Sequence, residues 1–438
     1  MASIEYRTPG VYVEEVSSGA RPIQAVGTRT AGFVGVTPQS AAHVNTTVPV
    51  NNWTEFLRKF AGPSADELKS LADAEAALEA VRAKDKPKAG EVTAAQKAVT
   101  DAQAVINAGK ESTNLSNAVY GFFLNGGSRC YVVNTGAADA TGLIDGLAQL
   151  ARIDDIAIVA APGHTTAEAY TAVRDHCDLL GDRVGILDAP DDLTDNVIMT
   201  LSGENVQGAT WKMPGSSQHG QVTLYTPWLK VSNPDRGNDP TKPNTIMVPP
   251  SGHVAGVWAR SDATRGVHKA PANEVIRGAI GVQRQITHEE QGGMNSNNVN
   301  CIRYFAREGI LVWGARTLTL DPAFKYLNVR RLFNMLEESI AESTRWIVFE
   351  PNDRPLWQAI RRDVSAFLMG FWRDGALMGT TPEEAFFVKC DAETNPIESI
   401  NEGRVVIEIG IAPVKPAEFV IFRISQYEAG TDVDVTGG

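Results

Sequence analysis

The chain has 438 residues, of which 43% are hydrophobic and 21% charged, a composition typical of a folded protein with two or three domains. Its formal net charge of −12 disfavours general binding to nucleic-acid phosphates. No apolar run reaches the roughly 18 residues that span a bilayer, and the first residues lack the apolar stretch of a signal peptide. We therefore expect the protein to fold in the cytoplasm and not to insert into a membrane.

The first predicted element is a short strand, residues 8–16, followed by a tether, residues 17–22, which together form an N-terminal arm (residues 1–22). Its apolar and aromatic positions are Val11, Tyr12, Val13 and Val16. A single strand cannot pair its own backbone groups, so this arm must join a sheet in the same chain or in another chain.

Strand and helix patterns then alternate, which predicts an α/β fold with a central, mostly parallel sheet. The predicted strands are residues 31–36, 130–134, 156–162, 183–190, 309–316 and 345–350, and the predicted helices are residues 141–151, 166–180 and 326–344. One core is thus predicted from an N-terminal part, residues 23–63 and 109–190, and a C-terminal part, residues 301–402.

Two insertions interrupt this core. Residues 64–108 predict an antiparallel helical hairpin, with a capping box at Ser64 and Glu67 and a turn at residues 87–90. It is either an exposed docking element or a tolerated surface insertion. Residues 191–300 are rich in loops, with a predicted strand at 222–231 and a short helix at 251–261, and form either a second small domain or an elaboration of the first.

Residues 352–373 predict an amphipathic helix that adds basic charge to an acidic chain. Its arginines form either a solvated face or a grip for an acidic partner surface. They are Arg354, Arg361, Arg362 and Arg373.

The C-terminal arm, residues 403–438, contains two strand patterns, residues 404–412 and 418–425, that are candidate partners for the N-terminal strand. Their apolar positions are Val405, Ile407, Ile409, Ile411, Phe419, Ile421 and Ile424.

The sequence contains none of the catalytic motifs for which we searched. It lacks a phosphate loop, a dinucleotide fingerprint and a nucleophile elbow, and His288 has no second histidine four residues on that would complete a zinc motif. The four cysteines are far apart, which favours reduced, buried thiols. An α/β hydrolase or nucleotide-binding enzyme remains an alternative on the strand–helix alternation alone, and a static shell or adhesin subunit is another.

Seven stretches, taken in order, resemble the tail sheath proteins of contractile phage tails and phage-tail-like contractile injection systems. They are residues 6–15 (YRTPGVYVEE), 249–256 (PPSGHVAG), 263–272 (ATRGVHKAPA), 312–316 (VWGAR), 328–331 (NVRR), 349–352 (FEPN) and 412–419 (APVKPAEF). The hairpin at residues 64–108 is the main departure from the pattern of that family.

The resemblance implies a non-enzymatic subunit of a helical sheath, built from stacked rings of six copies around an inner tube, that contracts to drive the tube through a target envelope. It implies further copies, the inner tube protein, the baseplate and a tail-terminator or cap protein as partners, with no cofactor, metal or nucleic acid. Terminal strands would be exchanged between copies, and we expect the arginines of residues 352–373 to face the tube. Assembly would take place in the bacterial cytoplasm, and the product would be a phage tail or tail-like particle.

Overall fold

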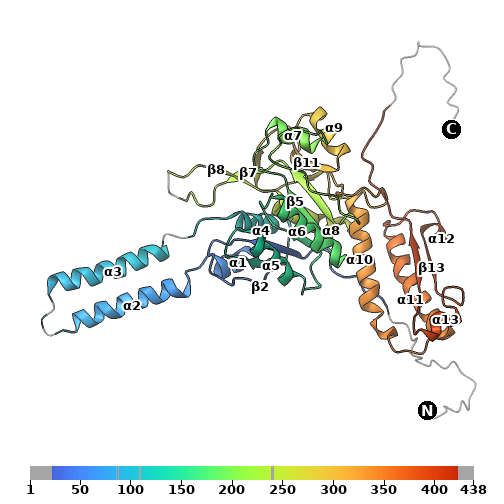
Figure 1. The fold of residues 1–438 in the computed structure, drawn as a ribbon, viewed down its shortest axis with the longest axis horizontal. Helices are drawn as coiled ribbons and strands as arrows, with labels where there is room; N and C mark the ends of the chain where they lie inside the picture. Colours follow the sequence, from blue (N-terminus) through green and yellow to red (C-terminus); the bar gives the residue numbers. More distant parts are fainter. Residues whose placement is uncertain (1–21, 85, 87, 108–109, 238–240, 423–438) are drawn as a thin grey trace, which may run out of the picture.

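The computed structural model describes residues 22–422 except 85, 87, 108–109 and 238–240 (Figure 1). Its centre is a nine-stranded sheet in the order β2-β3-β1-β4-β5-β6-β11-β12-β9. The strands are β1 Ala31–Gly35, β2 Thr47–Val50, β3 Cys130–Asn134, β4 Ile158–Ala160, β5 Val184–Asp188, β6 Val222–Thr226, β9 Glu274–Val275, β11 Val299–Phe305 and β12 Gly309–Trp313. The six strands from β3 to β11 in this order pair in parallel, and β2, β12 and β9 add antiparallel edges, which confirms the predicted α/β class.

Helices cover both faces of this sheet, which explains why strands β1, β3, β4, β5 and β6 are buried at every position. One face packs on α4 Asn114–Asn125 and α8 Ser251–Arg265, and the other packs on α5 Ala140–Leu150 and α6 Ala167–Leu180. Successive residues alternate between the two layers, so that Phe33 faces α4 and Val34 faces α5. The four cysteines are buried thiols, as predicted.

The loop-rich region is not a separate unit in the strand order. It supplies β6, which pairs with β5 on one side and β11 on the other, and β11 crosses the predicted boundary at residue 300. The predicted strand at 222–231 is two strands, because Pro227 separates β6 from β7 Leu229–Ser232. Strand β7 lies in a second, three-stranded sheet between β10 Ala279–Val282 and β8 Thr245–Val248. The short helices of this part of the chain are α7 Asp195–Leu201 and α9 His288–Ser296.

Helices α4 and α8 approach each other closely, which explains the glycines in the stretch 249–256. A Cβ atom on Gly256 would lie 2.4 Å from the carbonyl oxygen of Phe122, and one on Gly252 would lie 2.3 Å from the backbone of Ala118. The imidazole of His253 fills the space above Gly121, where burial lowers its pKa to about 4. These residues therefore serve helix packing.

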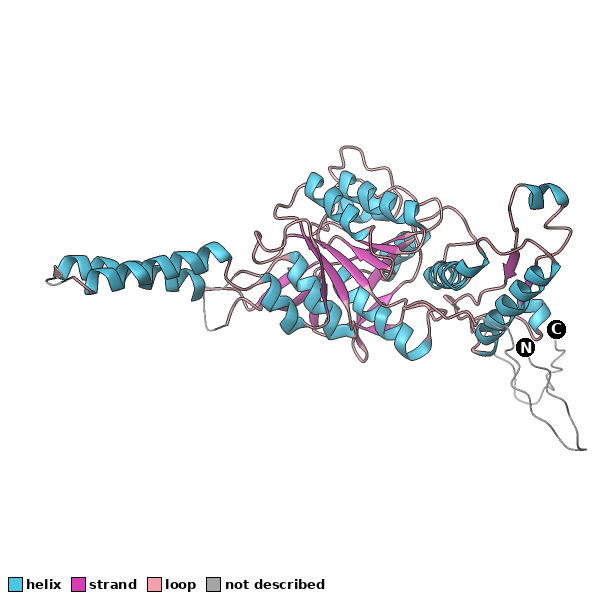
Figure 2. Cartoon of the chain, turned by 90° about the horizontal axis from the view of Figure 1, so that it is seen from below, coloured by secondary structure: helices cyan, strands magenta, loops and turns pink. Residues whose placement is uncertain are grey.

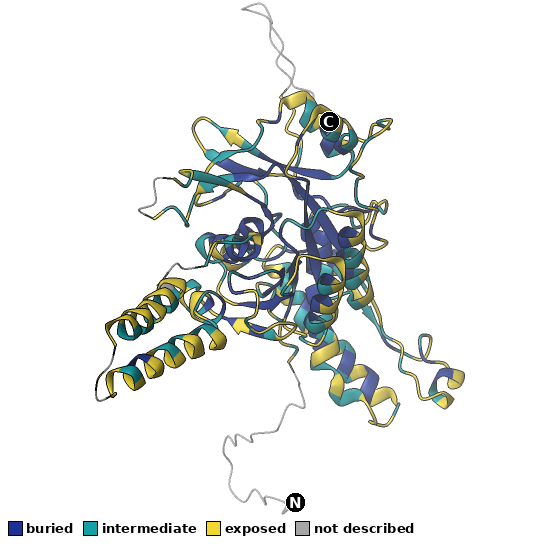
Figure 3. Ribbon diagram, turned by 60° about the vertical axis from the view of Figure 1, so that its left-hand side comes forward, coloured by how far each residue is buried: buried dark blue, intermediate teal, exposed yellow. Residues whose placement is uncertain are grey.

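The predicted hairpin is formed by α2 Ala65–Arg82 and α3 Ala89–Asn107, which follow the short helix α1 Trp53–Phe60. Ser64 and Glu67 make the predicted capping box, whereas the turn begins earlier than predicted, because α2 ends at Arg82 and α3 begins at Ala89. At 1.5 Å per residue the two helices extend about 27 Å. They project from the core and are mostly exposed (Figures 2 and 3). At the base, a hydrogen bond from Lys110 lowers the pKa of Glu67 to about 2.

The C-terminal residues form a module with its own apolar cluster at the end of the molecule opposite the hairpin (Figures 1 and 2). It contains α10 Leu327–Ser343, α11 Arg354–Arg373, α12 Pro382–Ala385 and α13 Ile397–Asn401, with β13 Phe386–Lys389 paired antiparallel to β14 Glu408–Ile411. The prediction of a strand at residues 345–350 was wrong. Residues Arg345–Ile347 form one 3-10 turn at the end of α10, and among the described residues no strand pairs with them.

Candidate assembly surfaces

The described chain begins as an extended segment that lies along α10. The backbone N–H of Gln24 donates to Ser343 Oγ at 3.2 Å, and that of Val26 donates to Ser339 Oγ at 3.0 Å. Ile23 and Val26 pack on the apolar cluster of the C-terminal module. The predicted arm residues Val11, Tyr12, Val13 and Val16 lie outside the described residues. The described segment reaches the C-terminal end of α10 at Gln24.

A buried ion pair locks this segment to the core. Arg331 on α10 makes two hydrogen bonds with Asp262 on α8, at 3.0 and 2.7 Å, and its guanidinium lies over the ring of Trp258. Thr28 completes the network, since its carbonyl accepts from Arg331 at 2.9 Å and its hydroxyl donates to Asp262 at 2.6 Å. The side chains of Arg331 and Asp262 are only 3% and 2% exposed. The N-terminal segment, α8 and α10 therefore share one buried polar network.

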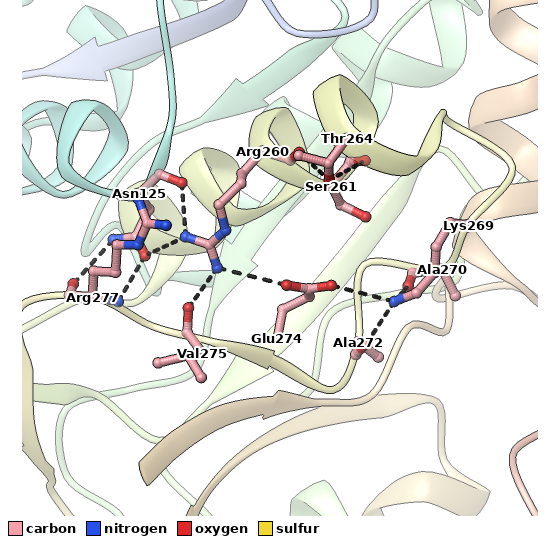
Figure 4. Close-up of polar contacts among 10 residues, drawn as sticks. All are labelled: Asn125, Arg260, Ser261, Thr264, Lys269, Ala270, Ala272, Glu274, Val275 and Arg277. Atoms are coloured by element: carbon pink, nitrogen blue, oxygen red, sulfur yellow. Dashed lines mark hydrogen bonds and ion pairs between the residues drawn. The ribbon is translucent and has the colours of Figure 1, made fainter. Parts of the chain in front are cut away.

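A second network fixes the connection between α8 and the sheet edge (Figure 4). Arg260 donates to the carbonyls of Asn125 at 2.9 Å and Val275 at 2.6 Å, and the Asn125 side chain accepts from the N–H of Arg277 at 2.8 Å. Lys269 donates to two loop carbonyls, at 2.6 and 2.9 Å, and its ammonium lies 3.6 Å from Glu274. These contacts connect α8 to β9 and to the loop between them.

The C-terminal arm differs from its predicted secondary structure. Of residues 404–412, only β14 is a strand, and the side chains of Val405, Ile407 and Ile411 pack in the C-terminal module of the same chain, while Ile409 is 36% exposed. Strands β13 and β14 pair only with each other within the described residues, so each has an open edge.

The described part of the second predicted strand, residues 418–422, is not in a strand. Phe419, Val420, Ile421 and Phe422 are 72–82% exposed, and Ile424 lies outside the described residues. A strand forms only beside a partner, and the described part of the chain pairs no strand with residues 418–422. The arm therefore presents an uncovered apolar run.

One charged pair anchors this apolar run, and sequence reasoning missed it. Arg316 makes a bidentate pair with Glu418, and one of its two bonds measures 2.9 Å. Both side chains are largely buried, and Tyr326 at the start of α10 contacts the same carboxylate. The available signal was that the stretches 312–316 and 412–419 each contain one partner of the pair. Gln24 and Glu418 thus contact residues at opposite ends of α10, a helix about 25 Å long at 1.5 Å per residue.

The four predicted arginines all lie on α11. Arg354, Arg362 and Arg373 are exposed and Arg361 is half-buried. Helical spacing at about 100° per residue places Arg354 and Arg361 on one face, and Arg362 and Arg373 on a neighbouring face. Arg362 also donates to Asp363 at 2.9 Å. The structure therefore gives two adjacent basic stripes.

The buried carboxylate of Asp188 has structural partners. Asp188 accepts from the N–H and hydroxyl of Ser251 at 2.8 and 2.7 Å and from the N–H of Gly163 at 3.1 Å. Burial raises its pKa to about 6, although these bonds oppose the shift. It holds the first turn of α8 at the end of β5. Over the described ranges, no group of three metal-ligating side chains and no membrane-spanning helix is found.

Two family models match adjacent parts of the chain. The phage tail sheath protein central domain matches residues 134–318, and the phage tail sheath C-terminal domain matches residues 319–426. The chain belongs to the phage tail sheath protein family.

Individual sheath proteins agree with this assignment. A prophage major tail sheath protein of Pseudomonas aeruginosa is 26% identical over 61% of the chain. A subunit of the sheath complex of an extracellular contractile injection system, PVC, in the contracted state, is 27% identical with a TM-score of 0.68, covering 97% of this chain and 99% of that one. A chain from the anti-feeding prophage baseplate is also 27% identical, with a TM-score of 0.67, covering 97% of this chain and 100% of that one. The chain spans 64% of the Pseudomonas relative and less than half of the tail sheath protein of Salmonella phage ViI.

Proposed function

We propose that this sheath protein polymerises as helical stacked rings of six copies around an inner tube and contracts to drive that tube through a target envelope. Its partners would be further copies, the tube protein, a baseplate and a tail-terminator or cap protein, with assembly in the bacterial cytoplasm and no catalytic activity. The likeness to a contracted sheath over 97% of the chain supports this function. The uncovered run Phe419–Phe422, anchored by Glu418, is the observation on this chain that carries it.

The run is best explained by strand exchange. An exposed apolar segment and the open edges of β13 and β14 are surfaces to which the strand of another copy can add. The N-terminal strand, residues 8–16, would supply that strand. At about 1 kcal/mol per net hydrogen bond, a five-residue strand contributes only a few kcal/mol, so one contact is weak and a lattice of contacts is strong.

Contraction would then be a rigid-body rearrangement. The networks around Arg331 and Arg260 hold the core and α10 together, so copies can rotate against one another while the exchanged strands keep them connected.

Deletion of residues 1–16 tests strand exchange. The truncated chain is expected to keep its circular dichroism spectrum and to lose tube formation in electron micrographs, because the core begins at residue 23 or later. Normal tubes from the truncated chain would disprove exchange of this arm.

Two further observations separate the alternatives. Stoichiometric nucleotide binding by the monomer would favour an α/β enzyme. A single lattice geometry under all conditions, with no shorter and wider form, would favour a static shell or adhesin.

The α11 arginines are proposed to face the tube. Charge reversal of Arg361 and Arg362 together should reduce co-assembly with the tube protein in pull-down and leave the unfolding midpoint of the monomer nearly unchanged, since Arg362 is exposed and Arg361 half-buried. Undiminished co-assembly would refute this orientation.

A further inference from the structure

The loop between α10 and α11 carries a fully exposed aromatic side chain. Phe349 has a relative exposure of 102%, the highest of any large apolar residue that the structure describes, and its neighbour Val348 is 63% exposed. Isolated surface apolar residues are common, but this pair forms a protrusion at the tip of a turn. The left-handed backbone of Phe349 and the hydrogen bonds of its loop distinguish it from an ordinary exposed residue.

Phe349 occupies the left-handed region, with φ of 71°. Bulky residues other than glycine rarely adopt this conformation, and it persists only where the surroundings impose it. Here the Glu350 N–H donates to the Ile347 carbonyl at 3.0 Å, and the Asn352 amide donates to the Arg404 carbonyl at 2.9 Å. The side-chain oxygen of Asn352 in turn accepts a hydrogen bond from the indole N–H of Trp357 at 2.8 Å. These hydrogen bonds hold the backbone from which the ring projects into solvent.

The position of the loop indicates what covers the ring. The loop follows the end of α10, where Ser343 holds Gln24 of the N-terminal segment. Trp346 and Ile347, just before the protrusion, pack in the same apolar cluster as Ile23. Phe349 thus follows residues that share a cluster with Ile23, and under the proposed strand exchange a copy that receives the arm would bind near this end of α10.

We propose that Phe349 packs against a second copy of this chain, in an apolar pocket completed by that copy's Phe419–Phe422 run. The proposal rests on the proposed strand exchange. It pairs two apolar surfaces that a single chain leaves uncovered, because the run is 72–82% exposed. A rigid aromatic ring buries a large area with little loss of conformational freedom, so it strengthens a contact that the backbone hydrogen bonds alone leave weak.

The first test compares three variants for tube formation, measured by sedimentation and electron microscopy. Phe349→Gly removes the ring and suits the left-handed backbone, so the monomer should keep or raise its melting temperature while tube yield falls at least tenfold. Phe349→Leu keeps an apolar side chain and should restore most of the yield. Leu179→Ala, at an 84% exposed position on α6, is the matched control and should assemble normally.

Normal tube yield from Phe349→Gly would overturn the proposal, as would an equal loss in Leu179→Ala. Deletion of residues 1–16 separates the two hypotheses. If the deletion abolishes tubes and Phe349→Gly does not, the proposed Phe349 contact is wrong and strand exchange stands. If the deletion has no effect, strand exchange fails, whatever the result for Phe349→Gly.

The second test identifies the partner. A photo-crosslinking benzoylphenylalanine at position 349, in particles assembled with the tube protein, should yield sheath–sheath adducts that map to residues 413–438 of the second copy. Adducts with the tube protein, adducts elsewhere on the sheath, or no adduct would each refute the proposal.

Discussion

Asp262→Asn tests whether the buried pair with Arg331 holds the N-terminal segment, α8 and α10 together. The substitution preserves the shape of the side chain and removes its charge. The guanidinium of Arg331 would keep its hydrogen bond to the Thr28 carbonyl at 2.9 Å and its contact with the Trp258 ring at 4.9 Å. It would no longer have an anion beside it. An unpaired charge at 3% exposure cannot be solvated in place.

The expected loss follows from this burial. Breaking a buried pair by removing one partner costs about 3–5 kcal/mol in the free energy of unfolding. Urea titration followed by tryptophan fluorescence should report the loss, because Trp258 lies directly beside the charge. Amide exchange should also accelerate at Gln24 and Val26, since Thr28 shares the carboxylate and joins their segment to the core.

The control is Glu342→Gln, which breaks the ion pair between Glu342 in the last turn of α10 and Arg345 in the 3-10 turn that follows. That pair is 3.5 Å long, with side chains 73% and 42% exposed, so its loss should cost less than about 1 kcal/mol. If Asp262→Asn destabilises the chain no more than Glu342→Gln does, the buried charge is not what joins the three segments.

Two further predictions concern packing and pH. Gly256→Ala should lower the free energy of unfolding by about 1–3 kcal/mol in urea titration, because the new Cβ would meet the Phe122 carbonyl. The control is Gly370→Ala on α11, where a Cβ would meet no atom within 4 Å beyond the nearby backbone of its own helix, so this substitution should be neutral or stabilising. Equal effects of the two substitutions would contradict the packing argument. Burial and neighbouring charge raise the pKa of Glu338 to about 7 from 4.5, so the folded chain binds this proton more tightly and loses stability as pH rises from about 4.5 through 7. The charges that act on it are Asp182, Glu342, Arg183 and Asp154. Glu338→Gln should flatten that decline between pH 5 and 8, and an unchanged slope would assign it to other groups.

The sequence by itself determined the elements whose signals are local. Apolar runs such as residues 31–35 and 130–134 are strands because both their faces are buried, and the Ser64 capping box marks the start of α2. The amphipathic stripe of α11 was equally clear, since helical periodicity needs no distant partner. The absence of a phosphate loop, a dinucleotide fingerprint and a nucleophile elbow could also be read directly from the sequence, because each of these motifs is local.

The tertiary structure decided everything that depends on partners far apart in the chain. Residues 345–350 contain an apolar run like those of the true strands, yet Arg345–Ile347 form a 3-10 turn, and no strand of the described chain pairs with them. Thr28 and Arg331 meet across 303 residues, and Arg316 and Glu418 across 102, so no local pattern announced either contact. Hydrogen bonds and ion pairs act over a few ångströms in space rather than along the chain. Only the folded arrangement therefore placed Gln24 and Glu418 at the two ends of α10.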